Sequence, residues 1–170
     1  MEVSLIRSWW FPWWSIGGDR FRYLKSPTWG KVDHQKAKYL IKKFTEGHRY
    51  EVFVGTDSDI RDGEVVYATA IVVYRLGNGA TYFYTVYKDG KNRDLYTRIF
   101  KEAEMSLEMA RFVEEVLELG KPVVHLDIGY DGLTKDLVSS VIGYVKGMGY
   151  PYQVKPDSFA ATKIAHKHTK

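Results

Sequence analysis

The sequence contains no cysteine, which excludes disulfide bonds, thiol catalysis and cysteine-ligated zinc sites. No apolar run approaches the roughly 18 residues that a membrane-spanning helix needs. Residues 9–16 are apolar, but Pro12 interrupts them and no small-residue cleavage motif follows. A Walker loop, a dinucleotide-binding glycine pattern and a Ser/His/Asp set are also missing. We therefore expect a cytoplasmic protein whose chemistry uses neither a thiol nor a nucleotide-binding loop.

The composition fits a single globular domain with one core. The chain has 170 residues, of which 45% are hydrophobic and 27% are charged. Its net charge of +4 is a mild bias toward an anionic partner such as nucleic acid.

Residues 1–32 are expected to form an aromatic-rich N-terminal arm, followed by one domain over 33–170. Prolines and glycines interrupt any helical or strand period in the arm. The arm carries four closely spaced tryptophans, Trp9, Trp10, Trp13 and Trp14. They either pack on the domain or on a second copy of the chain, giving a homo-oligomer, or they form a stacking surface for bases.

The domain is predicted to have the element order βββαβαβα after an opening helix over Val32–Thr45. Gly77-Asn78-Gly79 is a hairpin signal between two of the strands. The predicted strands are Tyr50–Thr56, Val65–Arg75, Ala80–Lys88, Lys121–Ile128 and Tyr152–Lys155. Helices are predicted from about Asp94 to Leu119, from Thr134 as the cap to about Gly147, and from Asp157 to the C-terminus.

This order predicts an α/β fold with a mixed five-stranded sheet and helices on both faces. The first three strands form an antiparallel meander, and the last two require parallel crossovers. We expect the strand order 3-2-1-4-5, in which the first and fourth strands are neighbours. Connections leave these two strands in opposite directions, and sites in open α/β sheets occur at such points.

Two aspartates are expected to meet at this position. Asp57 follows the first predicted strand, and Asp127 lies near the end of the fourth. An aspartate beside an apolar run is costly unless its charge is satisfied. Two neighbouring carboxylates also repel each other, and a divalent cation removes that repulsion. The alternative is that each aspartate only caps a loop.

Further ligand candidates come from two helices. On a helical wheel Glu102 lies beside the buried stripe of its helix, whereas most other carboxylates of that helix face solvent. Its alternative role is an ion pair with Arg98, one turn earlier. Asp157 is either an N-cap or a site residue, and His166 is either part of a solvated basic tail or a general base or fourth ligand.

Three motifs resemble one bacterial family. They are Val-Gly-Thr-Asp-Ser (54–58), His-Leu-Asp-Ile-Gly (125–129) and Lys-Pro-Asp-Ser-Phe-Ala-Ala (155–161). In this order they resemble the uncharacterised YkuK-like (DUF458) family, which is described as ribonuclease H-like. The resemblance covers roughly residues 48–170 and does not extend to the arm.

The resemblance implies a ribonuclease H-like fold with carboxylates that hold Mg²⁺ or Mn²⁺. Asp57 matches the aspartate of the first strand, Glu102 the glutamate of the first core helix, and Asp127 the aspartate of the fourth strand. The fourth position, on the last helix, falls to Asp157 or His166.

The leading hypothesis is a divalent-metal-dependent nuclease that cuts RNA or an RNA/DNA hybrid. Lys155 and Lys163 would then offset charge on the phosphate. Two alternatives stay open. The chain could be a nucleic-acid-binding module with a degenerate site, or an interaction and assembly protein that docks through its arm.

Overall fold

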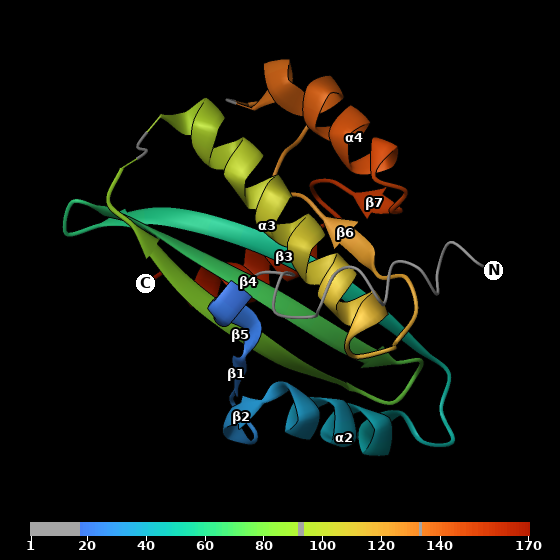
Figure 1. The fold of residues 1–170 in the computed structure, drawn as a ribbon. Helices are drawn as coiled ribbons and strands as arrows, with labels where there is room; N and C mark the ends of the chain where they lie inside the picture. Colours follow the sequence, from blue (N-terminus) through green and yellow to red (C-terminus); the bar gives the residue numbers. More distant parts are fainter. Residues whose placement is uncertain (1–17, 92–93, 133) are drawn as a thin grey trace.

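The computed structural model describes residues 18–91, 94–132 and 134–170, which form a sheet with helical layers on both faces (Figure 1). The strands are β1 (Tyr23–Ser26), β2 (Gly30–Asp33), β3 (Tyr50–Arg61), β4 (Glu64–Arg75), β5 (Ala80–Asp89), β6 (Val123–His125) and β7 (Tyr152–Gln153). The helices are α2 (His34–Thr45), α3 (Leu95–Glu115) and α4 (Val138–Gly147), with short helical turns η2 (Gly18–Phe21), η3 (Lys135–Leu137) and η4 (Ala160–Ala165). No helix among these residues combines the length and the apolarity that crossing a bilayer requires.

The sheet has seven strands in the order β2-β1-β5-β4-β3-β6-β7, so the predicted five-stranded sheet is corrected: β2 and β1 are added beside β5, and the five predicted strands follow as β5-β4-β3-β6-β7. The two additional strands come from residues 23–33, which the sequence analysis assigned mostly to the arm. The expected boundary at residue 32 falls inside β2, and the sheet takes residues from both sides of it. The four tryptophans of the arm lie outside the described residues.

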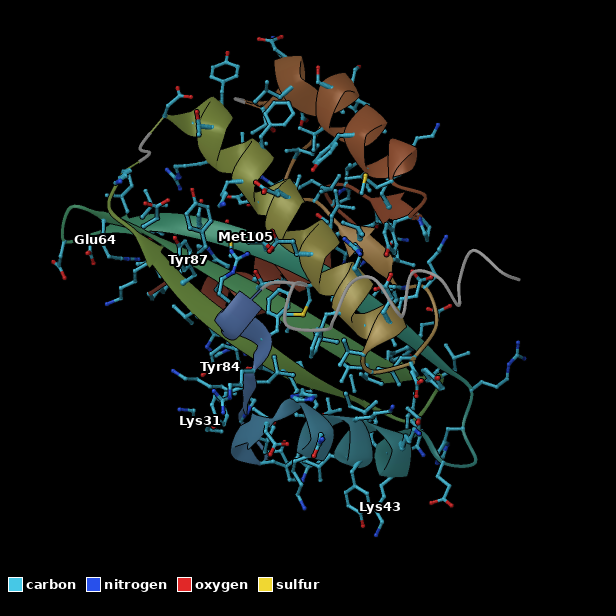
Figure 2. All side chains as sticks on the ribbon, in the orientation of Figure 1. Lys31, Lys43, Glu64, Tyr84, Tyr87 and Met105 are labelled. Carbon is cyan, nitrogen blue, oxygen red and sulfur yellow. The ribbon has the colours of Figure 1, made fainter. Side chains whose placement is uncertain are left out.

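The main core lies between the sheet and the helices α2, α3 and α4, with α3 in front of the sheet in Figure 1. Both long helices before residue 116 start at an aspartate, as their sequences indicate. Asp33 accepts a hydrogen bond from the backbone N–H of Lys36 at 2.7 Å, and Asp94 accepts one from that of Thr97 at 2.9 Å. Met105 of α3 packs against the sheet in a small cluster that Tyr87 of β5 borders (Figure 2).

A tight hairpin explains why β3 is longer than predicted. Asp62 and Gly63 both have positive φ, 50° and 81°, the combination that a two-residue hairpin turn requires. The pairing of β3 with β4 therefore continues to Arg61 opposite Glu64. As a result Asp57 lies within β3 and not after its end, which corrects the prediction.

The C-terminal helical segment lies behind the sheet and packs closely on β3 (Figure 1). Gly55 permits this contact, because a Cβ atom built there would lie 2.5 Å from the backbone nitrogen of Ala161. Two predicted caps are wrong. Thr134 makes no capping bond to the helical turn that follows it, and instead accepts a bond from the N–H of Gly129 at 3.3 Å. The last helix begins at Phe159 and not at Asp157.

We expect Gly55→Ala to destabilise the fold by about 1–3 kcal/mol, because the methyl group would press on the helix backbone. Gly143→Ala is the matched control, since a Cβ at that exposed position in α4 meets nothing within 4 Å. That change should stabilise the protein by up to about 1 kcal/mol through helix propensity. Urea unfolding of both variants measures the difference, and equal midpoints would contradict the close packing described here.

Candidate functional site

Asp57 lies within β3, and Asp127 lies two residues after the end of the neighbouring parallel strand β6, which is shorter than the predicted Lys121–Ile128. Gly55 and His125 are the last Cα partners that pair β3 with β6, and each aspartate lies two residues further along its chain. The negative charge of Asp127 contributes to the raised pKa of Asp57, so the two carboxyl groups lie within electrostatic reach of each other.

The environment of Asp57 is apolar, with one basic side chain at its edge. Its exposed fraction is 6%, and burial is the main cause of its raised pKa. A hydrogen bond between Asp57 Oδ2 and His166 Nδ1, 2.6 Å long, acts in the opposite direction. The side chain of His166 is 48% exposed, so this edge of the site is open to solvent.

Glu102 approaches from α3, and a pair of hydroxyl contacts fixes the register of that helix on β3. Ser58 Oγ donates to Glu102 Oε1 at 2.5 Å, and Ser106 Oγ donates to Thr56 Oγ1 at 2.8 Å. Four residues of a helix rise about 6 Å and two residues of a strand about 6.6 Å. The two spacings match, so both bonds form at once and hold Glu102 beside the site.

The carboxyl group of Glu102 is the most perturbed acid of the site. Burial raises its pKa to about 8, and the charges of Asp57 and Asp127 add to the shift. The predicted ion pair with Arg98 is not the arrangement seen. Arg98 donates to the hydroxyl and the carbonyl oxygen of Ser58, at 3.1 and 2.8 Å, and Ser58 in turn donates to Glu102.

Asp127 is satisfied by a lysine from the segment after β7. Lys155 Nζ lies 3.0 Å from Asp127 Oδ1, and the side chain of Asp127 is 23% exposed. A cavity of about 10 Å³ reaches both Glu102 and Asp127, which is roughly the room that one water molecule or a small ion needs.

Of the remaining predicted residues, His166 and Lys155 contact acids of the site, whereas Asp157 and Lys163 are exposed. His166 reaches Asp57 directly, as described above. Asp157 is exposed, and its charge acts on the pKa of His125. Lys163 is exposed on the last helix, and Lys155 contacts Asp127. The geometry therefore brings together Asp57, Asp127, Glu102 and His166, with Lys155 at the edge.

In the described ranges no group of three or more His, Asp or Glu side chains is placed so that it could hold a metal ion. Asp57, Asp127 and Glu102 each have a protein donor instead, namely His166, Lys155 and Ser58. The donor set nevertheless suits a hard divalent cation, because such cations prefer carboxylate oxygens. Burial and mutual repulsion raise the pKa values of Asp57 and Glu102, and a bound cation would relieve that repulsion. The positive charge of such an ion would compensate the carboxylates of Asp57 and Asp127, which His166 and Lys155 now contact.

Sequence reasoning missed the residues that hold these acids in place. Ser58 and Arg98 position Glu102, and the signal for Ser58 was its place beside Asp57 in a buried strand. His125 is fully buried, and its Nδ1 accepts the backbone N–H of Ala160 at 3.1 Å. Burial lowers the pKa of His125 to about 4, so the neutral ring ties β6 to the helix that carries His166.

Comparison with known proteins assigns the chain to a family. The family described as ribonuclease H-like matches residues 35–170, from α2 to the C-terminus. The chain belongs to this family. The uncharacterized protein YkuK of Bacillus subtilis (strain 168) is 32% identical over 139 residues, covering 71% of this chain and 80% of that protein. No solved structure gave a significant match. The range of the ribonuclease H-like match includes every acid and the histidine of the site.

The raised pKa of Glu102 predicts how the stability of this ribonuclease H-like protein depends on pH. In metal-free buffer the folded state keeps the Glu102 proton up to a pKa of about 8, whereas the unfolded state releases it near the ordinary glutamate pKa of 4.5. The folded state thus binds more protons, and the Glu102 contribution to stability falls as pH rises from 5 to 8. Glu102→Gln should remove roughly 2–4 kcal/mol of this decline.

Urea unfolding of the wild type and Glu102→Gln at several pH values measures the effect. Glu104→Gln is the matched control, because Glu104 lies on the exposed side of the same helix. Parallel stability curves for the wild type and Glu102→Gln would contradict a buried, protonated glutamate.

Proposed function

We propose that this protein is a divalent-metal-dependent nuclease that hydrolyses phosphodiester bonds, with RNA or an RNA/DNA hybrid as the favoured substrate. The observation that carries the proposal is the placement of Asp57 in β3 and of Asp127 just after the adjacent parallel strand β6, with the buried Glu102 within electrostatic reach of both. Membership of the ribonuclease H-like family supports a nucleic-acid substrate. Mg²⁺ or Mn²⁺ would be held by Asp57, Glu102 and Asp127, with His166 in the fourth position as a base that contacts Asp57.

A bound divalent cation would supply Lewis acidity toward the attacking water and the leaving oxygen. The chain's own residues supply the remaining functions. His166 Nδ1 lies 2.6 Å from Asp57 Oδ2; in the tautomer whose Nδ1–H donates to an ionised Asp57, Nε2 of the ring is able to accept a proton from water. Lys155, displaced from Asp127 when a cation binds there, would stabilise negative charge on the phosphate.

A second function, nucleic-acid binding without hydrolysis, is favoured by one observation. Asp127 is already paired with Lys155 and Asp57 with His166, so both carboxylates are satisfied within the chain. This alternative predicts salt-dependent binding that survives the loss of either aspartate. The hypothesis of assembly through the arm concerns residues outside the described ranges.

The nuclease proposal predicts hydrolysis of RNA, DNA or hybrid substrates that depends on Mg²⁺ or Mn²⁺. Asp57→Asn and Asp127→Asn should each lower the rate by at least about 100-fold, a typical loss for one preorganised electrostatic group. Gel analysis of end-labelled substrates measures this. Equal cleavage by the wild type and both variants would attribute the activity to a contaminant and overturn the proposal.

Two comparison variants sharpen this experiment. Asp136→Asn removes an exposed carboxylate in η3 and should leave the rate unchanged. Asp157→Asn should also leave it nearly unchanged, whereas His166→Ala should lower it, because His166 contacts Asp57. The opposite ranking would assign the fourth position to Asp157.

A further inference from the structure

One strip of the sheet surface beside the C-terminal helical segment carries lysines and tyrosines. A row of Cα partners runs across the sheet from β2 to β3 through Lys31, Lys25, Tyr84, Ala70 and Gly55. The helix covers the Gly55 end of this row. Lys25 and Lys31, at the other end, are exposed, and Tyr84 is half-buried between them and the helix.

The strip extends along the strands on the same face. Alternation in β1 directs Tyr23 and Lys25 to this face, because Leu24 between them belongs to the main core. In β5, Val86 and Lys88 follow Tyr84 at two-residue spacing and are exposed. We name this surface the β1–β5 strip; it consists of Tyr23, Lys25, Lys31, Tyr84, Val86, Lys88 and His168.

Flat rings on the strip are held in fixed orientations. The ring of His168 stacks on Tyr84, with centroids 3.5 Å apart and an interplanar angle of 11°. Tyr82, on the same strand, fixes His168 through a contact of 3.1 Å between its hydroxyl and Nε2. Tyr23 is 45% exposed, and Lys31 Nζ lies 4.6 Å from the centre of its ring. Fixed, partly exposed rings are suited to stacking on bases.

The lysines of the strip form no ion pair in the part of the chain that the structure describes, although Asp33, the Cα partner of Tyr23, lies beside the strip. Lys25, Lys31, Lys88 and Lys167 form none of the ion pairs found there, whereas Lys38, Lys101 and Lys155 each do. Besides burial, the charges of Lys167 and Lys25 lower the pKa of His168. Both ammonium groups therefore lie within electrostatic reach of the His168 ring. Figure 2 shows Lys31 and Tyr84 at one side of the sheet, apart from Lys43 on α2.

The strip leads to the candidate site. Asp57 is the Cα partner of Ala68, and Ala68 is the partner of Val86. Two strand spacings therefore separate Asp57 from the strip, which is roughly 10 Å. His168 also follows the Asp57 contact residue His166 by two positions on the last helix.

We propose that the β1–β5 strip binds single-stranded nucleic acid and guides it toward Asp57. Lysines without ion-pair partners attract the phosphates, and the rings of Tyr23, Tyr84 and His168 stack on bases that only an unpaired strand exposes. The choice of a strand as the occupant follows from this combination of charge and fixed rings. The proposal rests on the proposed nuclease function for what is cut, but binding to the strip requires no hydrolysis.

The test measures binding of the full-length protein to fluorescent single-stranded RNA and DNA of about 12 nucleotides in EDTA, with a duplex of equal length for comparison. We expect tighter binding of the single strands than of the duplex. The double variant Lys25→Gln/Lys31→Gln should weaken single-strand binding by at least about tenfold and reduce the slope of log K against log salt by roughly 1.4. Tyr23→Ala should weaken binding about five- to tenfold without changing that slope.

The control is Lys42→Gln/Lys43→Gln, which removes the same charge from the exposed surface of α2. Equal weakening by both double variants would show that net charge alone explains the loss of affinity, and would overturn the proposal. Unchanged binding by the Lys25→Gln/Lys31→Gln variant would overturn it as well. Sedimentation of the same proteins tests another occupant. A change in mass without a change in affinity would make the strip an interface between copies of the chain.

Failure of this proposal can be told apart from failure of the nuclease function. Single-strand binding that depends on the strip, in a protein without cleavage activity, would contradict the nuclease proposal and support the binding proposal. Metal-dependent cleavage that is insensitive to the strip variants would do the reverse. Asp57→Asn should bind single strands as well as the wild type does, because Asp57 lies outside the strip.

Discussion

The parallel pairing of β3 with β6 is the constraint on which the rest of this structure depends. It places Gly55 opposite His125, two residues before Asp57 and Asp127 respectively. The same pair also seats the last helix, because Gly55 leaves room for the backbone of Ala161 and His125 accepts the N–H of Ala160. One register therefore determines both the carboxylate pair and the position of His166. A shift by one residue would send these side chains to the other face.

Burial of these acids has a cost that the surrounding residues offset. Ionised carboxylates in an apolar environment are unfavourable unless they are paired or hydrogen-bonded. His166 and Lys155 supply positive partners for Asp57 and Asp127, whereas Glu102 has only hydroxyl and indirect arginine support, and its pKa rises to about 8. Asp57 and Asp127 thus have partners within the chain, while burial and mutual repulsion keep the pKa values of Asp57 and Glu102 raised; a cation bound there would relieve that repulsion.

Much of this arrangement could be predicted because it follows from strong local patterns. Apolar runs predicted the central strands, the asymmetric helix predicted an inward Glu102, and the ribonuclease H-like family agrees with the motifs that resembled it. The short strands β1 and β2 were missed, since four-residue strands beside Pro27 and Gly30 carry little periodicity. The full length of β3 was missed because the Asp62-Gly63 turn signal was overlooked. Contacts such as His166 with Asp57 join residues over a hundred positions apart, and no local pattern predicts them.

The most direct test of the account is a crystal structure of the protein soaked in Mn²⁺, with the ion located by its anomalous signal. The account predicts a peak between the carboxylates of Asp57 and Asp127, with oxygen ligands at about 2 Å, and Lys155 moved away from Asp127. Absence of a peak at saturating Mn²⁺, with Asp127 still bound to Lys155 and Asp57 to His166, would contradict it.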